Sequence, residues 1–234
     1  MDILDVLREQ LHEQASPLVA QQFQRFFKQP VNALGLKSAA VEQIAKANYS
    51  LIKSESKEKV FAYCEELWKS DWIEEDFIAC NWTYQRRKEY SIDDFKLFER
   101  WIDQYIKNWA SCDTFCNHSV GALLMMYPEL LPELTRWAQS PNLWLRRAAA
   151  VSLIVPARKG MFLDEIFQLA RILLLDQEDM VQKGYGWMLK VASKPHLDKV
   201  FDFVMEHQSV MPRTALRYAI EKMPQQMREE AMRK

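Results

Sequence analysis

Four side chains that could act on a polyanion recur at nearly equal intervals in the second half of the chain. They are Asp113, Arg147, Lys183 and Arg213, and the intervals between them are 34, 36 and 30 residues. A carboxylate can stabilise positive charge that develops at a reacting centre. Arginine and lysine can hold the phosphate oxygens around such a centre. The row predicts a nucleic-acid groove that holds one carboxylate.

Two tryptophans share helical faces with members of this row. Trp109 precedes Asp113 by one helical turn, and Trp187 follows Lys183 by one turn. The π face of an indole ring attracts a cationic centre. Alternatively, both rings belong to the hydrophobic core, and Asp113 is a solvated residue or a helix cap. Core positions are expected for the tryptophans outside the row, namely Trp68, Trp72, Trp82, Trp101 and Trp137.

The elements that must position these residues form a repeat. Residues 134–153, 169–189 and 200–220 each contain an amphipathic helix, a polar break and a second helix. A period of about 30 to 40 residues with two helices is typical of an α-solenoid of HEAT-like repeats. The second helices of such a stack line one curved face, so we expect the whole row on one concave surface. Small residues after the cations, such as Gly184 and Gly186, would let neighbouring helices approach closely.

The composition favours an all-α fold. Only 5 of 234 residues are glycine, about 2%, against a usual share of roughly 7%. Hairpins, Rossmann turns and phosphate-binding loops all use glycine, and neither GxGxxG nor GxxxxGK(S/T) occurs. We therefore predict an all-α solenoid, a single curved domain over residues 1–234.

Short polar and proline-containing clusters divide the chain into predicted helices of roughly 10–18 residues. The clusters are Gln29-Pro30, Ser54–Ser56, Tyr127-Pro128, Ser140-Pro141-Asn142, Lys194-Pro195 and Met211-Pro212. Two charged runs are expected to face solvent. They are the acidic run Glu74-Glu75-Asp76 and the basic run Arg86-Arg87-Lys88, of which the basic one could add a contact to a nucleic-acid backbone.

Charge and cysteine content restrict the classes of protein to which this chain can belong. Residues 1–99 hold 13 Lys/Arg against 17 Asp/Glu, and residues 100–224 hold 15 against 13, so a nucleic-acid role depends on where the cations point. The four cysteines lack the spacing of a disulfide framework or a closed zinc site, and we expect free thiols, no metal and no cofactor. The start of the chain has no signal-peptide pattern, and no stretch of 18 apolar residues occurs. These features predict a cytoplasmic protein without a membrane partner, and a monomer by default.

Four segments carry a resemblance to a known family. They are WASCD (109–113), SPNLWLRRAAAVSL (140–153), MVQKGYGWMLK (180–190) and TALRYAIEKMP (214–224). In this order and spacing, the chain resembles the bacterial AlkD-like DNA alkylation repair family, most strongly over residues 100–224. Members of that family are HEAT-like-repeat glycosylases that remove N3- and N7-alkylated purines from DNA.

The resemblance implies roles for single residues in the second half of the chain. Asp113 matches the family's catalytic carboxylate, and Trp109 and Trp187 match its two groove tryptophans. Arg147 matches its catalytic-site arginine. The remaining cations of the row, Lys183 and Arg213, would contact the DNA backbone further along.

Two further residues are DNA-binding candidates. Arg146 is adjacent to Arg147 on a helix, so the two cannot both point into the groove, and one is expected to pack or pair behind it. Phe26 matches an aromatic residue with which the family presses on DNA, but it lacks the hydroxyl of tyrosine. The segment LGLKSAAVEQIAKA also lacks a proline and an arginine that relatives often have there.

The implied function is that of a monofunctional DNA glycosylase in base excision repair. Such an enzyme hydrolyses the N-glycosidic bond of a cationic alkylpurine in double-stranded DNA and leaves an abasic site. One alternative is a catalytically silent HEAT-like protein that binds DNA structures in the same groove. Another is a helical-repeat scaffold that binds proteins.

Overall fold

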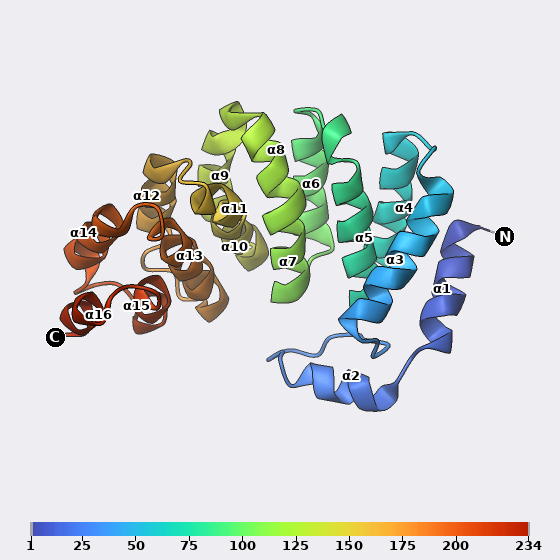
Figure 1. Cartoon of the computed structure of the whole chain (residues 1–234), viewed down its shortest axis with the longest axis horizontal. Helices are drawn as coiled ribbons and strands as arrows, with labels where there is room; N and C mark the ends of the chain where they lie inside the picture. Colours follow the sequence, from blue (N-terminus) through green and yellow to red (C-terminus); the bar gives the residue numbers. More distant parts are fainter. Residues whose placement is uncertain (1, 234) are drawn as a thin grey trace. The chain divides into compact units, whose positions relative to one another are not determined.

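The computed structural model describes residues 2–233, and every secondary-structure element in this range is helical (Figure 1). The all-α prediction is therefore confirmed. The chain divides into two compact units between Phe115 and Cys116. Within each unit, the helices pack against their neighbours in the manner of a helical repeat. The single domain over residues 1–234 stays a prediction.

The first unit is built around three neighbouring helices, α3 (Ser38–Ile52), α5 (Ile73–Gln85) and α7 (Trp109–Phe115), which pack α3 on α5 and α5 on α7 (Figure 1). Its other elements are α1 (Ile3–Glu13), α2 (Pro17–Gln24), α4 (Lys57–Lys69), the 3-10 turn η1 (Arg87–Glu89) and α6 (Asp94–Gln104). Aromatic rings fill the core of this unit, among them Trp68, Trp82, Trp101, Phe98 and Phe115. Of the tryptophans expected in the core, Trp68, Trp82 and Trp101 are buried here and Trp137 is buried in the second unit, whereas Trp72 is half-buried.

The second unit repeats this arrangement with α10 (Leu143–Val151), α13 (Asp179–Ala192) and α15 (Arg213–Ile220) as the neighbouring row. A further row is formed by α9 (Leu131–Ala138), α12 (Leu163–Ile172) and α14 (Leu197–His207), in which α9 packs on α12 and Phe167 of α12 stacks on Phe203 of α14. The remaining elements are the π-helical turn η2 (Cys116–Val120), α8 (Gly121–Met126), η3 (Pro128–Leu130), α11 (Ile154–Arg158) and α16 (Gln225–Met232). The helices that follow the polar breaks form one row within this unit, as the repeat predicted.

The helix boundaries follow local sequence signals. All six polar and proline-containing clusters lie between helices or at a helix start. The side chains of Ser16, Ser56 and Asn142 accept hydrogen bonds from backbone N–H groups in the first turns of α2, α4 and α10. The helices run from 5 to 15 residues, shorter at the lower end than predicted, because turns such as η2 and η3 interrupt the longer stretches.

One glycine explains how closely two of these helices approach. A Cβ at Gly186 in α13 would lie 2.7 Å from Tyr218 Cβ and 2.8 Å from the carbonyl oxygen of Ala215, both in α15. Such distances are shorter than van der Waals contact, so only glycine fits here. Among the residues described, the helices are too short or too polar to cross a bilayer.

The acidic run and the first residue of the basic run are not where the sequence analysis placed them, whereas Lys88 is exposed as expected. Glu74, Glu75 and Asp76 are all buried, with 3 to 5% of their surface exposed. Arg86 is also buried and donates to the carbonyl oxygens of Ile52 and Glu55. The prediction of solvent exposure was wrong at these four positions because each of these side chains has a hydrogen-bonding partner on another element. Such partners offset the cost of taking a charge out of water.

Candidate functional site

Helix α7 brings Trp109 and Asp113 together on one face of the first unit. They lie one turn apart, and both are half-buried. The ring of Trp109 stacks on that of Phe27, with centroids 5.5 Å apart and planes inclined by 23°. Its Nε1–H donates to the carbonyl oxygen of Phe26 at 3.3 Å. One face of the indole is therefore covered, and the ring is oriented by the segment that follows α2.

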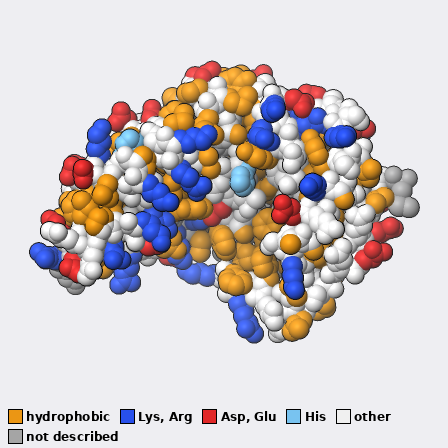
Figure 2. All heavy atoms as spheres, viewed as in Figure 1, with side chains coloured by type: hydrophobic (Ala, Val, Ile, Leu, Met, Phe, Trp, Pro, Cys, Tyr) orange, Lys and Arg blue, Asp and Glu red, His pale blue; other side chains and the backbone are white. Residues whose placement is uncertain are grey.

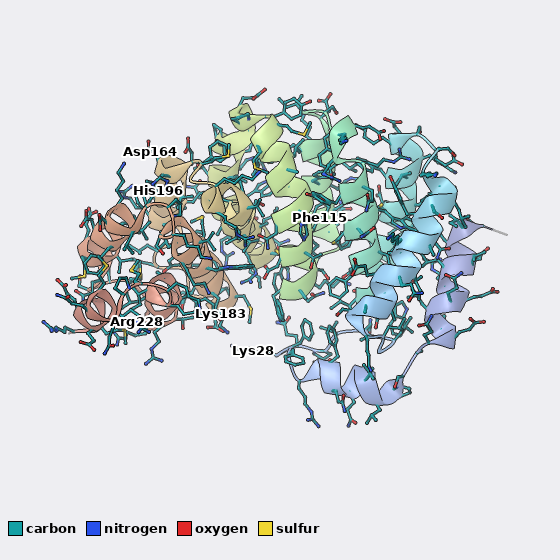
Figure 3. The ribbon with its side chains drawn as sticks, viewed as in Figure 1. Lys28, Phe115, Asp164, Lys183, His196 and Arg228 are labelled. Atoms are coloured by element: carbon teal, nitrogen blue, oxygen red, sulfur yellow. The ribbon has the colours of Figure 1, made fainter. Side chains whose placement is uncertain are left out.

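Two consecutive phenylalanines of this segment contact Trp109 in different ways. Phe26 is 71% exposed and meets Trp109 through its backbone, while the ring that packs on the indole is Phe27. Phe23 contacts Phe27, with ring centroids 5.0 Å apart. Lys28, labelled in Figure 3, follows directly. The sequence analysis missed Phe27, and the adjacent pair of phenylalanines was the only signal that could have indicated it.

The first turn of α7 is held by a buried hydrogen-bond network. Asn108 precedes the helix, and its side chain accepts from the Ser111 backbone N–H and donates to Ser111 Oγ, both at 2.9 Å. Ser111 Oγ donates to the carboxyl of Asp76 in α5 at 2.6 Å. Burial raises the pKa of Asp76 to about 8, and the negative charges of Asp71 and Glu75 add to this, whereas the hydrogen bonds of Ser111 and Asn108 oppose it.

A second buried carboxylate fixes the chain that leads from the aromatic segment to α3. The Glu74 carboxylate accepts the backbone N–H groups of Leu34, Gly35 and Leu36 at 2.8 to 3.2 Å. Gly35 has a φ of 88°, and a Cβ there would lie 2.1 Å from the carbonyl oxygen of Ser16. The turn therefore requires glycine, and Glu74 satisfies the N–H groups that it leaves.

Beside α7 lies a hollow of about 240 Å³, lined by residues of α3, α5 and α7. Its lining includes Val41, Ala45, Phe77 and Thr114, which directly follows Asp113. The hollow is mostly apolar, so this side of α7 could receive an uncharged part of a ligand.

In the second unit, Arg146 is held by protein partners, and its role as a DNA contact stays a prediction. Its Nε donates to Asp176 Oδ2 at 2.6 Å, and its Nη1 donates to the carbonyl oxygens of Ser140 and Pro141. These bonds tie the start of α10 to the turn before it and to the loop between α12 and α13. All three nitrogens of the guanidinium already donate to protein acceptors, so a phosphate would compete with these partners.

Arg147 is also more enclosed than a surface phosphate clamp would be. Only 5% of the residue is exposed, its Nη1 donates to the carbonyl oxygen of Met180, and its side chain packs against Gly184 in α13. It thus links α10 to the start of α13. Its catalytic role stays a prediction. If Arg147 acts on DNA, it does so while it also joins α10 to α13.

Lys183 and Arg213 come from the neighbouring helices α13 and α15. Lys183 pairs with Asp179 at 2.8 Å, one turn earlier on the same helix, and Arg213 is exposed at the first position of α15. Trp187, one turn after Lys183, is half-buried. On the face shown in Figure 2, lysine and arginine side chains gather over α13 and the helices that follow it. Lys183 and Arg228 in this region are labelled in Figure 3. The second unit therefore carries a cationic surface suited to phosphate groups.

Within residues 2–233, no group of three or more His, Cys, Asp or Glu side chains is arranged to hold a metal ion. The four cysteines are buried free thiols, and burial raises the pKa of Cys64 to about 12. A thiol with such a pKa is not a nucleophile near neutral pH.

Comparison with known proteins identifies the family to which this chain is similar. The model of the family described as DNA alkylation repair enzyme matches residues 7–223. A predicted DNA alkylation repair enzyme from Enterococcus faecalis has a solved structure that superposes with a TM-score of 0.81 at 20% sequence identity. The match covers 91% of this chain and 98% of that one. At this identity it shows a shared fold. None of the curated proteins matches the sequence significantly.

Proposed function

Because the chain belongs to the family of DNA alkylation repair enzymes, we propose that it is a monofunctional DNA glycosylase of base excision repair. Its substrate would be an N3- or N7-alkylated purine in double-stranded DNA, and its products the free base and an abasic site. The observation that carries this proposal is the pair on α7, a half-buried Asp113 one turn after a Trp109 whose ring is held by Phe27.

Because the substrate is cationic, a single carboxylate would be enough to assist cleavage of its glycosidic bond. An alkylated purine is cationic, and when the bond from C1′ to the base nitrogen breaks, its electron pair neutralises the base. The deoxyribose then carries oxocarbenium-like positive charge, as in other glycoside cleavages. Asp113 would stabilise this charge and accept a proton from the water that attacks C1′. Trp109 would present its uncovered face to the cationic centre.

Side chains of the second unit would also contact DNA. Lys183 and Arg213 would hold phosphates of the backbone, with Lys183 released from Asp179 on binding. Trp187 would offer a second indole face. Arg147 would act near the lesion through the part of its guanidinium that is accessible to DNA. Phe26, exposed beside Trp109, would contact the duplex in the first unit. The proposed enzyme works as a cytoplasmic monomer without a cofactor.

The deciding experiment measures release of 7-methylguanine from methylated duplex DNA by the wild type and by Asp113→Asn. We expect the variant to keep duplex affinity and lose at least about 100-fold in rate, because the oxocarbenium loses its stabiliser while the cations are untouched. Asp198→Asn, at an exposed position of α14, is the matched control and should release base at the wild-type rate. Equal release by wild type and Asp113→Asn would remove the catalytic assignment.

One observation favours a second candidate, a catalytically silent protein that binds DNA structures. The aromatic segment beside Trp109 offers only phenylalanine rings, so it has no phenolic hydroxyl to donate. Duplex binding without base release by the wild type would support this candidate. Binding that does not weaken as salt rises would exclude both DNA functions and favour a protein-binding scaffold.

A further inference from the structure

The three successive carboxylates at the start of α5 reach three different elements. Consecutive helical residues point about 100° apart, so Glu74, Glu75 and Asp76 fan out. Glu74 holds the turn around Gly35, and Glu75 forms an ion pair with Arg8 of α1 at 3.0 Å. Only Asp76 reaches α7, through Ser111. The first two carboxylates connect parts of the scaffold, whereas the third touches the helix that carries the candidate site.

The contact of Asp76 lies between the two residues that the proposed reaction needs. Ser111 follows Trp109 by two positions and precedes Asp113 by two. Its hydroxyl has a partner on each side, since it accepts from Asn108 Nδ2 at 2.9 Å and donates to Asp76 Oδ2 at 2.6 Å. All three residues of this network are buried. The rotation of α7 about its own axis is therefore set by a fixed point on α5.

Helix α7 needs such a fixed point because it is short. It spans only seven residues and runs directly into the π-helical turn Cys116–Val120. A π turn widens the helix, so the backbone that follows does not impose the ordinary helical register on the turn before it. Among the described residues, the network at Ser111 constrains α7 at its N-terminal end.

We propose that Asp76 is a positioning residue, which fixes the first turn of α7 through Ser111 and thereby holds Trp109 and Asp113 in place for base excision. This inference rests on the proposed function. A displacement of about 1 Å at a reacting group costs on the order of 100-fold in rate, whereas DNA affinity depends on cations that the network does not touch. Loss of the network should therefore lower the rate of the chemical step and leave binding nearly unchanged.

The test measures single-turnover release of 7-methylguanine at saturating enzyme, together with affinity for undamaged duplex by fluorescence anisotropy. Asp76→Ala and Ser111→Ala should each slow release by about 10- to 100-fold and change the dissociation constant by less than about threefold. The double variant should be no slower than the single ones, because both remove the same hydrogen bond. Asp76→Asn should keep a rate within about threefold of wild type, because its amide oxygen still accepts from Ser111.

The matched control is Glu75→Ala, which removes a carboxylate buried to the same degree on the same turn of α5 but without contact to α7. Its rate should stay within about threefold of wild type when measured below its melting temperature. A loss as large as that of Asp76→Ala would overturn the inference, because general destabilisation would then explain both. If Asp76→Ala does not fold, Ser111→Ala decides, and a wild-type rate for that variant also overturns it. No release by the wild type would instead refute the proposed function.

Discussion

Asp76 should make the stability of the protein fall as pH rises. Its carboxyl has an ordinary pKa of 3.8, and burial raises it to about 8 in the folded chain. Between these values the folded state holds a proton that the unfolded state has released. Folding therefore takes up a proton, and each rise of one pH unit lowers the free energy of unfolding by about 1.4 kcal/mol. Below about pH 4 and above about pH 8 this contribution is constant.

The variant that tests this is Asp76→Asn. The asparagine side chain has the shape of the protonated acid and does not titrate. The charged groups that raise the pKa of Asp76, namely Asp71 and Glu75, remain in the variant. Between pH 6 and pH 8 the free energy of unfolding of the wild type should fall by about 2 kcal/mol relative to that of the variant. The fall is smaller than the full slope would give, because the titration flattens as the pH approaches the folded pKa. Contributions from all other groups are common to both proteins and cancel in the difference.

Urea unfolding followed by circular dichroism at pH 6, 7 and 8 measures this difference. The stability of Asp76→Asn relative to wild type should rise steadily across the series. Parallel stabilities, within about 0.5 kcal/mol, would refute the reasoning. They would mean that Asp76 stays ionised when folded, stabilised by the positive end of α5, in whose first turn it lies.

Two pairs of variants test other parts of the structure. Gly186→Ala should lower the free energy of unfolding by about 2 kcal/mol, because its Cβ meets backbone of α15, whereas Gly184→Ala should change it by less than about 1 kcal/mol, because its Cβ finds ordinary contacts. Urea unfolding of both variants checks this, and equal effects would contradict it. Arg146→Met should cost about 2 kcal/mol by stranding Asp176 and leave duplex affinity unchanged. Arg213→Met should leave stability within about 0.5 kcal/mol, weaken duplex binding and reduce the slope of log affinity against log salt by about 1. Anisotropy titrations at several salt concentrations distinguish the two variants. Weaker duplex binding by Arg146→Met would identify Arg146 as a DNA contact.

The sequence by itself determined the helical class and the positions of the breaks. Low glycine content, helical spacing of apolar residues and proline-containing clusters act over a few residues, so they can be interpreted without the rest of the fold. The same holds for the close approach at Gly186, which the small residues after Lys183 predicted. The motifs around Asp113 and Lys183 also indicated the family that the comparison found.

Only the tertiary structure decided which charges are buried and which aromatic ring meets Trp109. Helical spacing could not separate Phe26 from Phe27, because the segment that carries them lies beyond the last turn of α2. Likewise, the adjacent Arg146 and Arg147 are told apart by partners on other elements.

The buried acidic run shows the physical reason most clearly. Glu75 pairs with a residue 67 positions away, Glu74 with backbone about 40 positions away, and Asp76 with a residue 35 positions away. In the sequence alone, three adjacent carboxylates indicate a solvated surface, because burying an unpaired charge is costly. Folding reverses this by bringing a partner to each carboxylate, and such partners are set by how helices pack rather than by neighbouring residues.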